Sequence, residues 1–514
     1  MMNNDQSIKF VLRCSGIFLL LTLCSGLQAQ QASEIGRQFH QQQSQRILAD
    51  FVDLLTLPNV ANDLDNMQRN AQWIEAYITK RGFTSQIVEA GGAPYVIAER
   101  KGSDSAPVVL IYAHFDGQPV IPEDWASPPF TPTLWTDIPD LPNASVLDMQ
   151  QTKYEDDWRL VARSAGDDKG PVIALMAAID ALVAADAMPD ITIKLFLDGE
   201  EEIGSPTLKG ILTKTAEQLS ADILLFCDGP MHQSRRRQVV LGVRGSMTID
   251  LTTYGANRPL HSGHYGNWAR NPNETMMQIL TSMKDVNGMP TVKGFTDTVT
   301  PISPAEIAAI DAMPRIDKPL AVSLGLSGGE AAGERIEAAI MRPAIVIKGL
   351  YGGGVKDKAR NVIESTANAS LNIRLVPGQT PEQVVASLKA HISALGFSVS
   401  EKEPTANALR NQYVKFVTRP GAYRAFRTPI EEPAVKQLVS ILDKLPGDDT
   451  LITPTLGGSL PIYLFEDMLD MPIVILPIAN HDNNQHGRNE NIRLKNFFDA
   501  IEIYAEIIDG FGTP

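Results

Sequence analysis

Hydrophobic and polar positions recur with two alternating periods along the first half of the chain. Ile47, Phe51 and Leu54 lie at helical spacing, and residues 66–80 predict a second amphipathic helix. Strand-like apolar runs follow at residues 84–88, 95–98 and 107–113. This succession of helices and strands continues to about residue 230 and predicts an α/β layer fold with a largely parallel sheet.

A second, smaller unit is predicted past Gly242, because a strand–helix pattern restarts there. Its predicted elements are strands at 247–254 and 370–376 and helices at 273–286 and 380–395. From about Thr428 the first pattern returns, with a helix at 432–445 and an apolar run at 471–477. We therefore expect a signal segment (1–29), a first segment of the larger domain (30–243), an inserted domain (244–423) and a second segment of the larger domain (424–514).

An acidic cluster, Asp198-Gly199-Glu200-Glu201-Glu202, directly follows the apolar run 191–197. The run predicts a buried strand, whose carboxyl end is where open α/β sheets place their ligands. Three consecutive glutamates repel one another, so a site built here needs compensating positive charge. The alternative is a solvated acidic turn.

Composition narrows the class of protein. With 514 residues, 20% of them charged and 44% hydrophobic, the chain is expected to form two or three globular domains. The formal charge of −15 argues against a nucleic-acid partner, whose phosphates require clustered Lys and Arg. The one basic run, Arg235-Arg236-Arg237, is short and is interpreted as an exposed loop or strand edge.

The first 29 residues have the layout of a secretory signal. Basic residues precede the apolar stretch 16–23, which is shorter than the ~20 residues that a membrane-spanning helix needs. This predicts a cleaved peptide, a periplasmic or secreted enzyme and no membrane span, with lipidation at Cys24 the less favoured alternative. Cys227 then stands alone and is interpreted as a buried structural thiol.

Other acidic and imidazole groups also follow strand-like runs or begin a helix. They are His114-Phe115-Asp116, Asp167-Asp168, Asp228 and His486. Asp116 lies two residues after His114 on the same side of extended chain, so it can hydrogen-bond the ring and fix its tautomer. Taken singly, these residues could be surface turns or helix caps. Together, two imidazoles and three or more carboxylates make up the ligand set of a two-zinc hydrolytic site.

With these motifs the chain resembles the M20 metallopeptidase family, in particular its carnosinase-like dipeptidases. The matching pieces run in the family's order over nearly the whole chain: His114-Phe115-Asp116, Asp167-Asp168-Lys169-Gly170-Pro171, Glu201-Glu202-Ile203-Gly204-Ser205, Asp228, Leu260-His261-Ser262-Gly263, Ile373-Arg374-Leu375-Val376-Pro377, Gly457-Gly458-Ser459 and His486-Gly487-Arg488-Asn489-Glu490. The resemblance implies a zinc-exopeptidase-like catalytic domain with a central mixed sheet. It also implies that a smaller α/β lid and dimerisation domain interrupts this catalytic domain.

The resemblance also assigns metal ligands and catalytic groups. Asp167 would bridge two Zn²⁺ ions, with Mn²⁺ or Co²⁺ as alternatives. His114 and Asp228 would complete one zinc site, and Glu202 and His486 the other. Glu201 would be the general base and Asp116 the partner of His114. His261 would stabilise the oxyanion from the other subunit of a homodimer.

Substrate contacts are implied at three further positions. Arg374 lies in an otherwise apolar strand, where the alternative to a ligand contact is a snorkelling or salt-bridged arginine. The family assigns this position to the terminal carboxylate of the substrate, which suits a planar guanidinium. Asn361 and Ser459 match neighbouring contacts. Asn361 stands where carnosinase-like relatives often carry threonine and Leu456 where they carry an acid, so both departures concern substrate recognition.

The leading hypothesis is an exported zinc exopeptidase for dipeptides or very short peptides. In the resembling group, aspartate at position 228 goes with dipeptidases and aminopeptidases, and glutamate is commoner in carboxypeptidases and deacylases. The runner-up is an N-acyl amino acid deacylase with the same metals and base. A catalytically silent peptide-binding protein is a third hypothesis, but such a protein would usually have lost Glu201 or a ligand.

Overall fold

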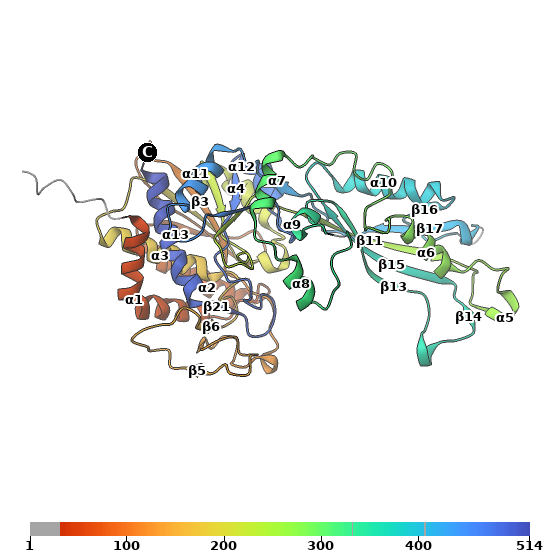
Figure 1. Ribbon diagram of the computed structural model, residues 1–514, viewed down its shortest axis with the longest axis horizontal. Helices are drawn as coiled ribbons and strands as arrows, with labels where there is room; N and C mark the ends of the chain where they lie inside the picture. The colour runs from red at the N-terminus through yellow and green to blue at the C-terminus, as the bar shows by residue number, and fades with distance from the viewer. Residues whose placement is uncertain (1–30, 332, 406–407, 514) are drawn as a thin grey trace, which may run out of the picture.

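The computed structural model describes residues 31–331, 333–405 and 408–513. They form an elongated molecule with a larger unit at one end and a smaller unit at the other (Figure 1). The predicted signal segment, residues 1–29, lies outside the described residues. Within the described ranges, no helix has both the length and the apolar character that crossing a bilayer would require.

A mixed eight-stranded sheet forms the centre of the larger unit. In spatial order its strands are β1 (Thr84–Val88), β2 (Tyr95–Arg100), β7 (Thr192–Asp198), β3 (Val108–His114), β8 (Ile223–Phe226), β20 (Ile473–Ile475), β9 (Gln238–Val240) and β19 (Leu451–Thr453). The parallel pairs are β3 with β7 and β8, β8 with β20, and β9 with β19, while the other pairs are antiparallel. The prediction of a largely parallel sheet was therefore wrong for the β1–β2, β2–β7 and β20–β9 pairs, and the mixed sheet implied by the family resemblance is confirmed.

Helices cover both faces of this sheet, because alternate strand residues point to opposite sides. On β3, Val109 and Ile111 belong to one buried cluster and Leu110 and Tyr112 to another. The first cluster is covered by α1 (Ala32–Leu55), α2 (Leu64–Thr79), α3 (Lys169–Ala184), α11 (Pro433–Leu442) and α13 (Leu494–Gly512). The second is covered by α4 (Leu208–Leu219) and α12 (Tyr463–Leu469). The predicted helix around Phe51 is confirmed as α1, whose Phe51 ring stacks on Phe497.

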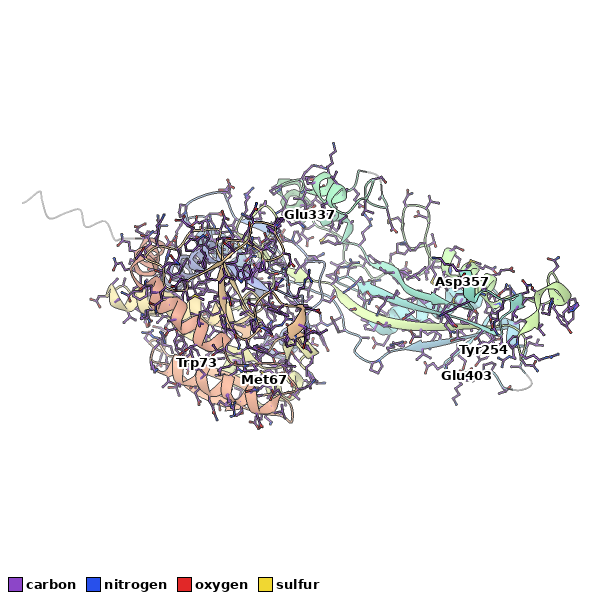
Figure 2. The ribbon with its side chains drawn as sticks, turned by 90° about the horizontal axis from the view of Figure 1, so that it is seen from below. Met67, Trp73, Tyr254, Glu337, Asp357 and Glu403 are labelled. Carbon is purple, nitrogen blue, oxygen red and sulfur yellow. The ribbon has the colours of Figure 1, made fainter. Side chains whose placement is uncertain are left out.

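The smaller unit is built on a five-stranded sheet with helices on one face. Its strands, in spatial order, are β13 (Ala344–Tyr351), β15 (Thr366–Leu375), β11 (Gly245–Tyr254), β17 (Tyr413–Thr418) and β16 (Ser398–Ser400), and its helices are α6 (Pro272–Thr281) and α10 (Pro381–Ala394). Figure 2 shows Tyr254 and Glu403 together in this unit, where the Tyr254 hydroxyl donates to the Glu403 carboxylate. The far end of the unit carries β12 (Leu260–His261), α5 (Ser262–Tyr265) and β14 (Val362–Ile363) (Figure 1).

The helix predicted over 273–286 is shorter than expected. It ends at Thr281, and Val286 is 97% exposed. The chain turns there because Asp285 Oδ1 accepts the N–H groups of Asn287 and Met289, both at 2.9 Å, and Gly288 takes a positive φ of 78°.

The two units are joined by a narrow ribbon and by a helical segment. In the ribbon, β10 (Gly242–Val243) pairs antiparallel with β18 (Phe426–Arg427). A Cβ on Gly242 would lie 2.4 Å from Phe426 O, so the ribbon requires glycine there. The segment holds α7 (Pro304–Ala312), α8 (Asp317–Ser323) and α9 (Ile336–Ala339). Glu337 of α9 lies where the units meet (Figure 2), and Glu306 of α7 pairs with Arg427 at 2.8 Å.

Residues 122–160, where no strand was predicted, contain short strands. β4 (Thr133–Trp135), β5 (Val146–Leu147) and β6 (Arg159–Val161) join β21 (Asn491–Arg493) in a four-stranded sheet. Strands of two or three residues are too short to show a period of two, which explains the omission. Four single-turn 3₁₀ segments complete the described structure: η1 (Pro122–Asp124), η2 (Glu201–Ile203), η3 (Lys356–Lys358) and η4 (Arg410–Gln412).

Candidate metal centre

Three neighbouring parallel strands deliver acidic and imidazole groups to one edge of the larger sheet. β3 ends at His114, which pairs in register with Asp198 at the end of β7. β8, on the other side of β3, leads into Asp228 two residues beyond its last strand residue. The start of α3 brings Asp167 and Asp168 to the same place, and the loop after β20 brings His486.

The Asp167 carboxylate lies between the two imidazoles. Its Oδ1 is 2.8 Å from His114 Nε2, and its Oδ2 is 3.2 Å from His486 Nε2. Glu202 Oε2 is 3.1 Å from the same His486 nitrogen. One carboxylate thus faces a different imidazole with each oxygen, which is the placement that a bridging ligand needs.

Two groups of ligand atoms are compact enough to hold a metal ion. His114, Asp168 and Asp228 form one, and Asp167, Glu202 and His486 form the other, with the ligand atoms of each group within 4.8 Å of one another. Asp168 had no predicted role as a ligand. It is 2% exposed, and its Oδ2 accepts the backbone N–H of His114 at 3.2 Å. The doubled aspartate in the sequence was the available signal.

The donor set fits divalent cations. Four carboxylates, those of Asp167, Asp168, Asp228 and Glu202, are almost fully buried and share only two imidazoles. Burial raises the pKa of Asp228 to about 7, with His114 lowering it and Asp167 raising it. Clustered buried carboxylates of this kind are costly unless cations offset their charge.

Glu201 belongs to neither group of ligand atoms, although it adjoins Glu202 in the chain. Burial raises the pKa of Glu201 well above its usual value. The charge of His114 opposes this shift, and the charges of Asp228 and Asp167 add to it. A carboxyl with a raised pKa beside the candidate ligands is suited to accepting and releasing a proton near neutral pH.

Asp116 contacts the ring of His114 and also supports the acidic loop. Its Oδ1 lies 3.3 Å from His114 Nδ1. The same carboxylate accepts the backbone N–H groups of Glu201 and Glu202, both at 3.0 Å. This second contact was not predicted, because it depends on how the loop after β7 folds back over β3.

Glu490 supports the loop that contains Asp167. Its Oε1 accepts the backbone N–H groups of Gly166 at 3.2 Å and Asp167 at 3.1 Å. Its Oε2 accepts from Arg163 Nη1 at 2.6 Å, and burial raises the pKa of Glu490 to about 7. Sequence reasoning placed Glu490 in the motif with His486 but gave it no role.

The predicted substrate contacts fall in two places. Arg374 on β15 donates from Nη1 to Ser459 Oγ at 2.7 Å, so these two lie together at the junction of the units. His261 and Asn361 lie together elsewhere, since Ser262 N donates to Asn361 O at 3.0 Å and His261 pairs with Val362. This second pair adjoins α5 and β14, which lie at the far end of the smaller unit, away from β3 and the candidate metal centre (Figure 1).

Comparison with known proteins finds similarity to peptidases at the level of both a domain profile and whole sequences. A sequence profile described as "Peptidase dimerisation domain" of the M20 group matches residues 241–398. A Cys-Gly metallodipeptidase of Schizosaccharomyces pombe is 24% identical over 421 residues, which cover 81% of this chain and 82% of that protein. A Beta-Ala-His dipeptidase of Rattus norvegicus is 24% identical over 421 residues, which cover 80% of this chain and 78% of that protein.

Among solved structures, an M20 family metallo-carboxypeptidase from Sulfolobus solfataricus superposes with a TM-score of 0.72 at 25% identity. The match covers 91% of this chain and 99% of that chain. It confirms the predicted fold class, an α/β catalytic unit combined with a dimerisation unit.

One prediction is contradicted by these relatives. We expected a periplasmic or secreted location from the first 29 residues. The yeast dipeptidases to which the chain is similar, including the S. pombe protein, are cytosolic, so that location is wrong.

Proposed function

Because this chain is an M20-type metallopeptidase with the dimerisation domain of that family, we propose that it hydrolyses dipeptides or very short peptides at a two-zinc centre. The observation that carries the proposal is the Asp167 carboxylate between His114 and His486, with Glu201 beside it but outside both ligand groups. The dipeptidase names of the S. pombe and rat relatives support the choice of substrate class.

The metal ligands in the proposal follow the two groups of atoms. His114 and Asp228 would hold one ion, Glu202 and His486 the other, and Asp167 would bridge the two. Asp168 is buried against His114 and Asp228 and is a further candidate at the first ion. When bound, the two ions would supply Lewis-acid activation of water and polarisation of the peptide carbonyl, for which zinc is suited and manganese or cobalt are alternatives.

The proton transfer is assigned to a side chain of the protein. In the proposal, the Glu201 carboxylate takes a proton from the attacking water and delivers it to the nitrogen of the departing amine. Its raised pKa brings it closer to the pH at which it must do both. Asp116 keeps His114 oriented and holds the loop that carries Glu201.

Substrate recognition is assigned to the smaller unit and the junction. The Arg374 guanidinium, hydrogen-bonded to Ser459, would receive the terminal carboxylate of the peptide. His261 and Asn361 lie too far along the smaller unit to serve the metal centre of their own chain, which supports a role in the partner subunit of a homodimer. The domain limits 244–423 for this lid and dimerisation unit are part of the proposal.

The test is hydrolysis of a panel of free dipeptides and of the same dipeptides acetylated at the amino end, with the zinc-loaded enzyme. The proposal expects cleavage of the free peptides and little or none of the acetylated ones. Preferential cleavage of the acetylated set would instead establish the runner-up, an N-acyl amino acid deacylase, with the metal centre unchanged.

A further inference from the structure

A second arginine, with no predicted role, lies beside Arg374 at the junction of the units. Arg244 immediately precedes β11, whose Ser246 pairs in register with Arg374 on β15. Arg244 is 8% exposed, and its Nη2 donates to the carbonyl oxygen of Arg342 at 3.0 Å. Its Nε is buried without a hydrogen-bond partner. Among the described residues, no carboxylate pairs with either Arg244 or Arg374 within 4.0 Å.

Both arginines are attached to the same glycine-rich loop. The backbone N–H of Arg244 donates to Gly458 O at 3.2 Å, and the Arg374 side chain donates to the next residue, Ser459. Tyr423 lies next to this loop and exchanges two backbone hydrogen bonds with Ser246. Burial raises the pKa of Tyr423, the Ser459 hydroxyl and the charge of Arg374 lower it, and the charge of Glu201 raises it, so Tyr423 lies within electrostatic range of both Arg374 and the proposed base.

The positive charges of Arg244 and Arg374 have no negatively charged partner among the described residues. Burial and, to a smaller extent, the positive charge of Arg374 together lower the pKa of Arg244 to about 10. A buried guanidinium without an anion, next to a second one, costs free energy that an incoming carboxylate would recover. Other buried arginines among the described residues have such a partner: Arg163 pairs with Glu490, and Arg335 with Glu337.

We propose that Arg244 is a specificity-determining residue whose unpaired charge, next to Arg374, selects substrates that end in a free carboxylate. The inference rests on the proposed function, in which Arg374 receives that carboxylate, and adds a second positive charge to the same site. The competing explanation is purely structural: Arg244 would serve only to tie β11 to the carbonyl of Arg342.

The test compares a free dipeptide with its carboxyl-terminal amide in four zinc-loaded enzymes: wild type, Arg244→Gln, Arg244→Lys and Arg237→Gln. Glutamine removes the charge and keeps a donor, whereas lysine keeps the charge. Arg237 is the matched control, because it too is partly buried with an unpartnered Nε, and its Nη groups bind only the carbonyls of Leu445, Pro446 and Asp448.

For Arg244→Gln we expect the KM of the free dipeptide to rise about tenfold, with kcat and the rate on the amide changed less than about threefold. Because salt screens charge, the KM of this variant should also depend less steeply on ionic strength than that of the wild type. Arg244→Lys should keep most of the preference for the free carboxylate. Arg237→Gln should leave the ratio of free to amidated substrate unchanged.

Four outcomes would overturn the inference. Equal losses on the free and amidated substrates in Arg244→Gln would make the residue structural, and so would a lysine variant as impaired as the glutamine variant. If the wild type prefers free dipeptides and Arg244→Gln loses activity on neither substrate, Arg244 does not determine specificity, and the proposed function still stands. A wild-type enzyme that cleaves neither substrate would refute both.

Discussion

Asp116 Oδ1 accepts the backbone N–H of Glu201 at 3.0 Å, so the carboxylate that faces His114 also holds the loop of the proposed base. In Asp116→Asn one oxygen becomes an amide nitrogen, and one of the N–H groups of Glu201 and Glu202 loses its acceptor. We expect zinc affinity and kcat each to fall about 10- to 100-fold. Metal titration and steady-state kinetics measure both.

Asp190→Asn is the matched control for Asp116, because Asp190 also accepts a backbone N–H, that of Ser103 at 2.8 Å, on the surface. It should leave zinc affinity and kcat near wild type. Wild-type values in Asp116→Asn would show that the contact with Glu201 contributes nothing to the centre.

Glu490 and Arg163 form an ion pair that is 1% and 2% exposed, with nitrogen and oxygen 2.6 Å apart. Glu490→Gln leaves the Arg163 charge buried without its carboxylate, so we expect the free energy of unfolding to fall by about 3–5 kcal/mol. Urea unfolding of the zinc-free protein measures it. Because the two side chains contact each other, Arg163→Gln combined with Glu490→Gln should cost less than the sum of the single changes. If the stability loss of the double variant equals the sum of the two single losses, the two side chains do not stabilise each other.

Asp482 should make stability fall at acidic pH. Burial opposes ionisation of its carboxyl, but hydrogen bonds and charge from Arg159 outweigh burial and hold its pKa below the usual value. The stabilisation is therefore complete above the unfolded pKa of about 4 and is lost as the pH falls through the lower folded pKa. Asp482→Asn should be less stable at pH 7, and its difference from the wild type should shrink between about pH 4 and pH 2. Denaturant unfolding across that range tests this. A stability difference between Asp482→Asn and the wild type that does not change with pH would contradict a stabilising Asp482–Arg159 pair.

His261 should act across a dimer, because it lies at the far end of the smaller unit. His261→Ala and Glu201→Gln homodimers should each be nearly inactive. Mixed dimers carry one centre with both an intact base and an intact partner histidine, so they should recover up to about half of wild-type activity. Activity of co-expressed, doubly tagged dimers measures this, and no recovery in confirmed mixed dimers would contradict the arrangement.

The sequence was most informative where chemistry follows a long apolar run. His114, Glu201, Glu202 and Asp228 each come after a buried strand, and parallel pairing of β7, β3 and β8 brings those ends together. Apolar patterning predicts the strands, and open α/β sheets bind their ligands at the carboxyl ends of their strands. These two observations are enough to predict that the acidic and imidazole groups lie together. Asp116 was placed next to His114 by the same reasoning.

Contacts that depend on loop paths were beyond such reasoning. Glu490 reaches the N–H of Asp167 from more than 300 residues along the chain, and no local pattern marks that pairing. Arg244 differs from any other buried arginine only through what surrounds it, the Arg342 carbonyl and Arg374. The four-stranded sheet containing β4–β6 was missed because its strands are too short to show periodicity.

The central claim is that the cluster is a metal-dependent hydrolytic centre with Glu201 as its base. The most direct measurement is metal content and dipeptide turnover in Glu201→Gln beside its neighbour Glu202→Gln. We predict that Glu201→Gln keeps zinc near the wild-type level while kcat falls by about 10²- to 10⁴-fold or more, because a positioned base is lost and no ligand is. Glu202→Gln should lose about one ion. Loss of zinc from Glu201→Gln, or wild-type turnover in that variant, would contradict the assignment.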